Sequence, residues 1–303
     1  MPWSPRGVVV PAPPPLPWAV SHTSLPVVAV GTEGLRLYCS SRDAHGRSHV
    51  ASGWLDLEAG SATFDQDPAI TIGPLGAFDD NGVTSSCVVE HGGRVFQYFT
   101  GWSLGVTVPF YLAIGCAVSE DGGRTFAKAS AAPVLGRTSI DPYLTASPCV
   151  LVEGGVWRMW YVSGTAWEAE RGEARHRYHI RYAESEDGLD WKPTGIVCID
   201  YRDERETAIA RPCVVNDGTV YRMWFCARGD AYRIGYAESA DGLTWTRLDG
   251  ARDVGPSRQG WDAEMQAYPF VFDLERTRHM LYNGNGYGAT GVGHAVLEPD
   301  AAT

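Results

Sequence analysis

The sequence predicts an all-β protein, a five-bladed β-propeller with four antiparallel strands in each blade. Three observations support this: a segment that recurs five times, Asp-Gly turns between alternating apolar runs, and abundant glycine, proline and aromatic residues. Asp-Gly between alternating runs is a strong hairpin signal, and repeated sets of four short strands are typical of propeller blades. In a single domain over 1–303, the blades are expected at approximately 20–60, 79–128, 141–193, 204–248 and 262–298.

Two copies of the repeat match most clearly. One begins SPCVLVEGGVWRMWYVSG at Ser147, and the other begins RPCVVNDGTVYRMWFCARGD at Arg211. Their closing tryptophans lie 54 residues apart, whereas their Met-Trp pairs lie 64 apart, so the first copy carries an insertion within 163–178. We expect this insertion to be a polar loop of mixed charge, either a lid at the rim of the propeller or a solvated surface loop.

Composition limits the partners of the chain. The net charge of −11 disfavours nucleic acid and anionic membranes, and there is no long basic run. No apolar stretch reaches 18 residues, and the proline-rich start does not read as a signal peptide, so the expected location is cytoplasmic. The seven cysteines form no CxxC pair and are expected as small buried hydrophobes rather than as disulfides or metal ligands.

Carboxylates recur in the loops that lead into the first strand of each copy. We expect these leading loops to share one face of the propeller with the loops between the second and third strands. Their acids therefore form the first set of candidates, with a histidine in the first copy: His22, Asp80, Asp141, Glu206, Asp262 and Glu264. The competing interpretation is that these acids cap backbone N–H groups of their own loops.

Aromatic and polar residues on the same expected face form a second set, suited to stacking on sugar rings and bonding hydroxyl groups. The candidates for substrate binding, in addition to Asp262, are Trp102, Tyr143, Trp167, Arg211, Arg228, Tyr268, Asn283 and Asn285. No spacing indicates a metal site, and no cofactor is expected. The repeated Ser-x-Asp-Gly-x-x-Trp turns fall on the opposite face, where we expect a structural role.

The motifs RPCVV, YRMWFCARG and RIGYAESADGLTW resemble the five-bladed propeller glycosidases, among them the arabinanase/xylosidase, invertase-like and mannoside-phosphorylase families. The resemblance covers nearly the whole chain. It implies a glycoside hydrolase-like enzyme that acts on a small sugar or glycoconjugate by carboxylate acid/base catalysis. By chain order it implies that Asp141 positions and tunes, while Glu206 donates the proton to the leaving group.

The chain departs from this family at the first catalytic position, because the early Asp-Pro motif is absent and His22 lies in the corresponding loop. Asp80 or Glu264 would then supply the base, or His22 would act itself, since its usual pKa suits neutral pH. A third alternative is phosphate as the nucleophile, bound by arginines. The remaining alternative is a non-hydrolytic role: phosphorolysis, rearrangement of a sugar-like metabolite, or sugar binding alone.

Overall fold

The computed structural model describes residues 3–170, 172–250, 254–255, 257 and 259–298. Nearly all of its regular structure is β-strand, with one four-residue helical turn, α1 (Asn285–Gly288), so the prediction of an all-β fold is confirmed. No helix in these ranges is long and apolar enough to cross a membrane.

The strands follow one another in antiparallel sets of four, which we call units 1 to 5. Unit 1 contains β2 (Ser21–Gly31), β3 (Gly34–Arg42), β4 (Ser48–Asp56) and β5 (Ser61–Phe64). Unit 2 contains β6 (Gly82–His91), β7 (Arg94–Leu104), β8 (Phe110–Ser119) and β9 (Ala127–Lys128). Unit 3 contains β10 (Thr145–Glu153), β11 (Val156–Glu170), β12 (Glu173–Ser185) and β13 (Lys192–Ile199).

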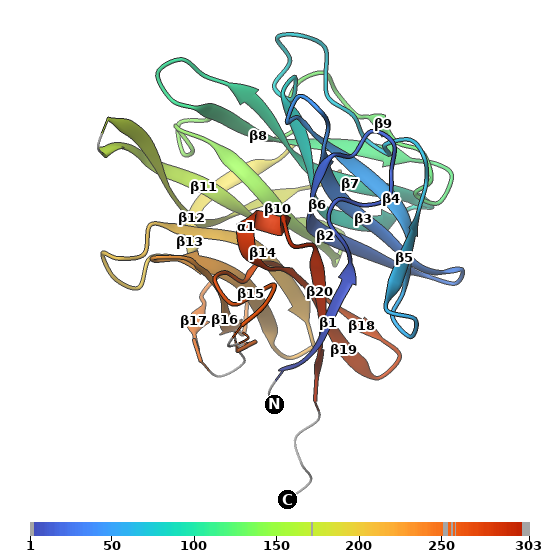
Figure 1. Cartoon of the computed structure of the whole chain (residues 1–303). Coiled ribbons are helices and arrows are strands. Elements are labelled where there is room, and N and C mark those ends of the chain that lie inside the picture. The colour runs from blue at the N-terminus through green and yellow to red at the C-terminus, as the bar shows by residue number, and fades with distance from the viewer. Residues whose placement is uncertain (1–2, 171, 251–253, 256, 258, 299–303) are drawn as a thin grey trace, which may run out of the picture.

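The last two units complete the chain. Unit 4 contains β14 (Ala208–Asn216), β15 (Tyr221–Arg228), β16 (Tyr232–Ser239) and β17 (Thr246–Arg247). Unit 5 contains β18 (Ala267–Leu274), β19 (Thr277–Asn283), β20 (Val292–Leu297) and, as its outer strand, the N-terminal β1 (Trp3–Val10). Pairing of β1 with β20 brings strands from the two ends of the chain together in unit 5 (Figure 1).

The first strands of the units contact one another in a cycle, in the order β2, β6, β10, β14, β18 and back to β2. We call the line around which they gather the axis. Hydrogen bonding groups all the strands into three sheets, because parallel bridges join unit 1 to unit 2 and unit 3 to unit 4. The architecture is therefore propeller-like, and the count of five separate blades stays a prediction.

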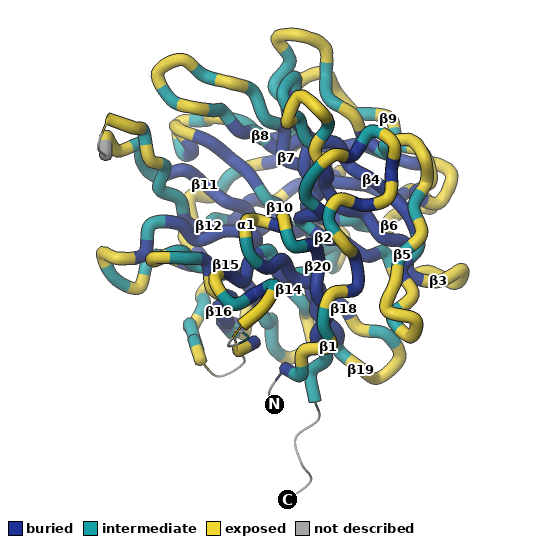
Figure 2. Tube along the Cα trace, viewed as in Figure 1, coloured by how far each residue is buried: buried dark blue, intermediate teal, exposed yellow. Residues whose placement is uncertain are grey.

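The core lies between neighbouring units, where buried strands surround the axis and exposed turns lie at the periphery (Figure 2). The recurrent cysteines belong to this packing. Backbone N–H groups of the next unit donate to the thiols of Cys87, Cys149 and Cys213 at 3.1–3.3 Å. All seven cysteines are free and buried, which confirms their interpretation as core residues.

The Ser-x-Asp-Gly turns have the structural role expected of them. The Asp187 carboxylate accepts hydrogen bonds from the N–H groups of Leu189 and Asp190 at 2.8 and 2.9 Å, and the Trp191 indole donates to Gly188 O. The corresponding turn at Asp241 repeats this pattern. These acids hold their own turns.

The insertion in unit 3 is not a loop, which corrects the prediction from the sequence. It extends β11 and β12 into a long antiparallel hairpin, paired from Trp157↔Ser185 to Glu170↔Glu173. Alternation within the insertion explains the difference, since Trp167 and His176 pair across the strands and pack together.

Candidate functional site

One face of the molecule carries the leading loops and the ends of the hairpins between second and third strands, and we call it the working face. Antiparallel pairing brings the start of each first strand beside the end of the second, as in Ala208↔Arg228 and Ala267↔Asn283. In Figure 1, α1 lies near the centre of the ring, where it contacts the start of β2.

Each first strand contains a bulge close to this face. Four of the bulges carry a non-glycine residue with positive φ immediately before a proline: Leu25, Ser147, Arg211 and Tyr268. This conformation costs about 1–2 kcal/mol for a residue with a Cβ, and such strain often marks functional sites. The bulge of unit 2 falls at Ser86. None of these five positions is acidic.

Arg211 spans the axis. Its guanidinium donates to Pro26 O in unit 1 at 3.0 Å and to Ser85 O in unit 2 at 3.2 Å, although Arg211 itself belongs to unit 4. The residue is 1% exposed. Arg211 therefore lies beneath the working face and links three units, a different position from the substrate-contacting one expected from the sequence.

Four tyrosines gather on the working face between units 3, 4 and 5. The hydroxyls of Tyr178 and Tyr232 share a hydrogen bond, and the Tyr232 ring lies 6.2 Å from the rings of both Tyr268 and Tyr287. Burial raises the pKa of Tyr178 to about 12 and raises those of Tyr232 and Tyr268 well above 10. The phenols of Tyr178, Tyr232 and Tyr268 are thus neutral hydrogen-bonding groups at physiological pH.

A second aromatic group continues from these tyrosines across units 3 and 2. The His176 ring stacks on Tyr178 at 4.8 Å and 4°, and Phe110 contacts His176, Trp167 and Trp102 at 5.0–5.5 Å. Burial, followed by the charge of a nearby arginine, lowers the pKa of His176 to about 4. A neutral aromatic surface therefore extends from the axis toward unit 2.

Arg228 supplies the positive charge of this surface. Its guanidinium lies 5.7 Å from the centre of the Tyr232 ring and near the Tyr287 hydroxyl, and its Nε donates to Thr207 Oγ1 at 3.2 Å. Among the ion pairs between described residues, none links Arg228 to a carboxylate. A charged fork among hydroxyl groups is suited to bind a polar ligand.

His22 lies at the start of β2, the strand that contacts α1. It has a φ of 63°, its Nδ1 lies 3.0 Å from Ser21 Oγ, and its ring bonds the backbone of Gly286. Burial, followed by the charge of Arg42, lowers the pKa of His22, so the imidazole is largely neutral near pH 7. A neutral imidazole is able to accept a proton.

Four of the five candidate acids of the leading loops bond groups of their own units instead of converging on the axis as expected from the sequence, and the fifth, Glu264, is exposed. Asp141 is fully buried, and its carboxylate accepts from Ser163 Oγ at 2.6 Å and Tyr161 OH at 3.0 Å, with Arg181 at 3.5 Å. These groups all belong to unit 3. The Asp141 carboxylate anchors its loop.

Asp262 repeats this role in unit 5, where it is buried and accepts from Gln266 Nε2 at 2.9 Å and Tyr282 OH at 3.1 Å. In unit 2, Asp79 pairs with Lys128, and Asp80 accepts from the backbone N–H of Gly76. The alternative considered from the sequence, that these acids satisfy their own loops, fits these contacts.

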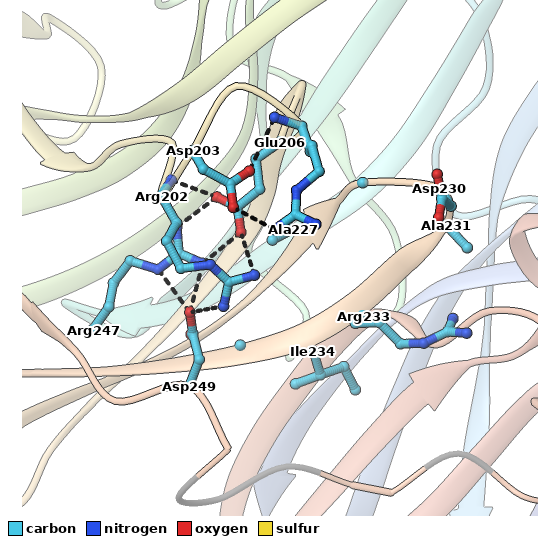
Figure 3. A pocket seen from close by; sticks show the side chains of 13 residues that line it. Arg202, Asp203, Glu206, Ala227, Asp230, Ala231, Arg233, Ile234, Arg247 and Asp249 are labelled. Carbon is cyan, nitrogen blue, oxygen red and sulfur yellow. Dashed lines mark hydrogen bonds and ion pairs between the residues drawn. The ribbon is translucent and has the colours of Figure 1, made fainter.

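Glu206 has the same arrangement in unit 4, at a charged pocket of about 420 Å³ away from the axis. Arg247 donates to both its oxygens at 2.7 and 2.9 Å, and Arg202 N donates at 2.7 Å. Burial acts to raise the pKa of Glu206, but these bonds outweigh burial and lower it. Figure 3 shows the carboxylate held between Arg202 and Arg247, with Arg233 across the pocket. A proton donor needs the opposite shift.

The other candidates divide between scaffold and surface. Asn283 is buried and bonds Leu25 N, Thr23 O and Gly291 O, and Asn285 bonds the loop before β18. Glu264 and Tyr143 are exposed and do not belong to the aromatic groups described above.

Sequence reasoning missed Phe110, Tyr178 and Tyr232, which complete the aromatic surface. They share one signal, since each lies at or near the working-face end of the third strand of its unit. No group of three or more His, Cys, Asp or Glu side chains in the described ranges is placed to hold a metal ion.

We compared the chain with known protein families, with curated proteins and with solved structures. No family model matches the chain. Among solved structures, the BT0996 RGII complex has a TM-score of 0.74 at 15% identity, covering 97% of this chain and 94% of that protein. A thermostable family-43 glycoside hydrolase has a TM-score of 0.70 at 16% identity, covering 94% and 93%. The β-fructofuranosidase BmSUC1 of Bombyx mori has a TM-score of 0.68 at 14% identity, covering 97% and 62%.

These structural likenesses show that the chain has the fold of glycosidase-like propellers. Two curated relatives are closer in sequence. MT1551 of Mycobacterium tuberculosis (strain CDC 1551 / Oshkosh) is 44% identical over 286 residues, covering 93% of this chain and 95% of that protein. Rv1502 of M. tuberculosis (strain ATCC 25618 / H37Rv) is 43% identical over 286 residues, again covering 93% of this chain and 95% of that protein. The chain therefore belongs to the family of these two mycobacterial proteins.

Proposed function

We propose that the chain is a five-bladed propeller that binds a sugar or sugar-like metabolite on the working face, without hydrolysis by a pair of carboxylates. The observation that carries this proposal is the separation of the aromatic surface from the acids. Trp102, Phe110, Trp167 and the tyrosines lie on the working face, whereas the carboxylates of Asp141 and Glu206 are bound within their own units.

Sugar binding needs apolar faces for the ring and polar groups for the hydroxyls, and aromatic side chains with a polar end supply both. Tyr287 and the partly exposed Tyr178 offer rings and hydroxyls together above the buried Tyr232, and the Arg228 guanidinium adds further donors. The glycosidase fold of the structural neighbours supports the same class of ligand.

Two-carboxylate hydrolysis requires one protonated acid and one ionised partner on either side of the scissile bond. Glu206 is ionised by its arginines, and Asp141 is enclosed by Tyr161 and Ser163. This arrangement provides neither group at the axis.

Binding of unlabelled mono- and disaccharides, measured by saturation-transfer NMR, tests the proposal. We expect Tyr287→Ala, at a ring that is 45% exposed, to weaken binding about tenfold, consistent with the loss of about 1–2 kcal/mol of contact. Val156→Ala, an exposed apolar site at the β10–β11 turn on the opposite face, is the control and should bind normally.

Assays with aryl glycosides, with and without phosphate, test the catalytic part. We expect no cleavage in either condition. Turnover by the wild type that Glu206→Gln abolishes while the variant stays folded would overturn the proposal and restore carboxylate hydrolysis. Failure of every sugar to bind would exclude a carbohydrate ligand.

A further inference from the structure

Several partly buried cations of this acidic protein are paired with carboxylates. Arg247 bonds Glu206, Arg278 bonds Asp217, and Lys128 bonds Asp79. The cations nearest the axis differ, because neither Arg228 nor Arg211 has a carboxylate within 4 Å among the described residues. In a chain with a net charge of −11, these two arginines near the axis thus lack a carboxylate partner.

The surroundings of Arg228 strengthen this contrast. Its neighbours include the hydroxyl of Thr207, the ring of Tyr232 and the hydroxyl of Tyr287, none of them a carboxylate. His176 is close enough for Arg228 to affect its titration, and it is neutral. The guanidinium is only partly exposed, and a partly desolvated cation without a counter-ion is unfavourable.

Arg211 adds a second positive charge beneath the same face. Within the described part of the chain, its guanidinium bonds the carbonyl oxygens of Pro26 and Ser85, which supply partial charges and no ion. The potential at the axial end of the working face is therefore positive, and low-dielectric surroundings strengthen its effect on a ligand there.

We infer that the ligand of the working face carries an anionic group, a phosphate ester or a carboxylate, which Arg228 receives through its guanidinium fork. This inference rests on the proposed function, since the remainder of the ligand is the sugar bound by the aromatic surface. Planar guanidinium groups bind both anions in a bidentate way.

Isothermal titration calorimetry at fixed ionic strength tests the inference. The probes are glucose, mannose and fructose, the 6-phosphate of each, glucuronate, and inorganic phosphate alone. We expect an anionic sugar to bind at least about tenfold more tightly than its neutral parent, because a charge-assisted hydrogen bond to Arg228 is added. A comparison of the affinities for sugar phosphate and for glucuronate shows whether the site prefers a phosphate ester or a carboxylate.

Variants of Arg228 test whether this residue causes the preference for anionic sugars. Arg228→Gln should abolish the preference while leaving weak binding of the neutral sugar, and Arg228→Lys should retain part of the preference. Arg94→Gln is the matched control, because Arg94, the first residue of β7, lies over the Phe96 ring at 5.1 Å at the opposite end of unit 2. Thermal melts confirm that each variant is folded.

The outcomes separate the two proposals. Equal binding of neutral and anionic sugars, or a preference that survives Arg228→Gln, overturns the inference and leaves the proposed function in place. Binding of inorganic phosphate without any sugar, or no binding by any probe, overturns the proposed function itself.

Discussion

Replacing Arg211 by methionine tests whether the side chain that crosses the axis holds the units together. The substitution keeps the apolar stem of the side chain and removes the guanidinium. It leaves the carbonyl groups of Pro26 and Ser85 without their donors in a buried place. The positive φ of residue 211 is unchanged, so backbone strain is similar in both proteins.

The expected loss follows from two opposing effects. Two hydrogen bonds from a charged donor contribute about 1.5–3 kcal/mol each. Removing a buried cation recovers part of this, because burial disfavours the charge and lowers the pKa of Arg211. We therefore expect a net loss of about 2–4 kcal/mol in the free energy of unfolding, which for a chain of this size lowers Tm by about 3–6 °C.

Arg233→Met is the matched control in chemical denaturation and calorimetry. Arg233 also donates to two backbone carbonyls, Tyr232 O at 2.9 Å and Glu264 O at 2.7 Å, but it is exposed. Water replaces its bonds when it is removed, so we expect a loss below about 1 kcal/mol. Arg211→Lys, which keeps the charge without the fork, should fall between the two.

The sign of the change in unfolding free energy shows whether Arg211 links the units. If Arg211→Met is as stable as the wild type or more stable, the burial of the charge outweighs its bonds, and the axial arginine is not a structural link. A loss no larger than that of the Arg233 variant leads to the same conclusion.

Three further outcomes are expected. Glu206→Gln should lower stability by about 1–3 kcal/mol, because it removes the charge that binds Arg247 in a buried pair, while sugar binding in NMR stays within about twofold of wild type; lost binding at unchanged stability would refute this. Asp141→Asn should cost about 2–4 kcal/mol in urea denaturation, because one carboxylate oxygen that accepts buried bonds becomes a donor; a neutral effect would contradict the anchoring role. Burial, followed by the charge of His279, lowers the pKa of His294 to about 4. The unfolded chain therefore binds the proton first, and stability present above about pH 6.5 should fall by about 2 kcal/mol between about pH 8 and pH 5; His294→Gln should flatten this Tm profile, and an unchanged slope would count against it.

Much of the architecture was predictable because it depends on local signals. Asp-Gly turns, alternating strands and the repeated Cys-Val core positions each act within a few residues, so the strand sets follow directly from them. The hairpin in unit 3 was missed although its pattern is local. Its many charged residues were interpreted as a loop, while Trp167 and His176 supply the alternation that continues the strands.

The candidate site was predicted in part. The sequence placed Arg228, Trp102 and Trp167 on the face where the aromatic surface lies. It also nominated acids by their repeated offset from the first strand, and that offset is real: Asp141 and Asp262 occupy equivalent, buried positions.

By itself, the sequence determined the repeated strands, the face on which the leading loops meet, and the residue types available there. Only the tertiary structure decided where the carboxylates point. A leading loop is able to turn its acid toward the axis or back into its own unit, and the partners that select the second direction, such as Lys128 for Asp79 and Arg247 for Glu206, lie 49 and 41 residues further along the chain. Because a buried carboxylate is stable only beside such donors, their position in space decides that these acids are anchors and that the axis holds cations instead.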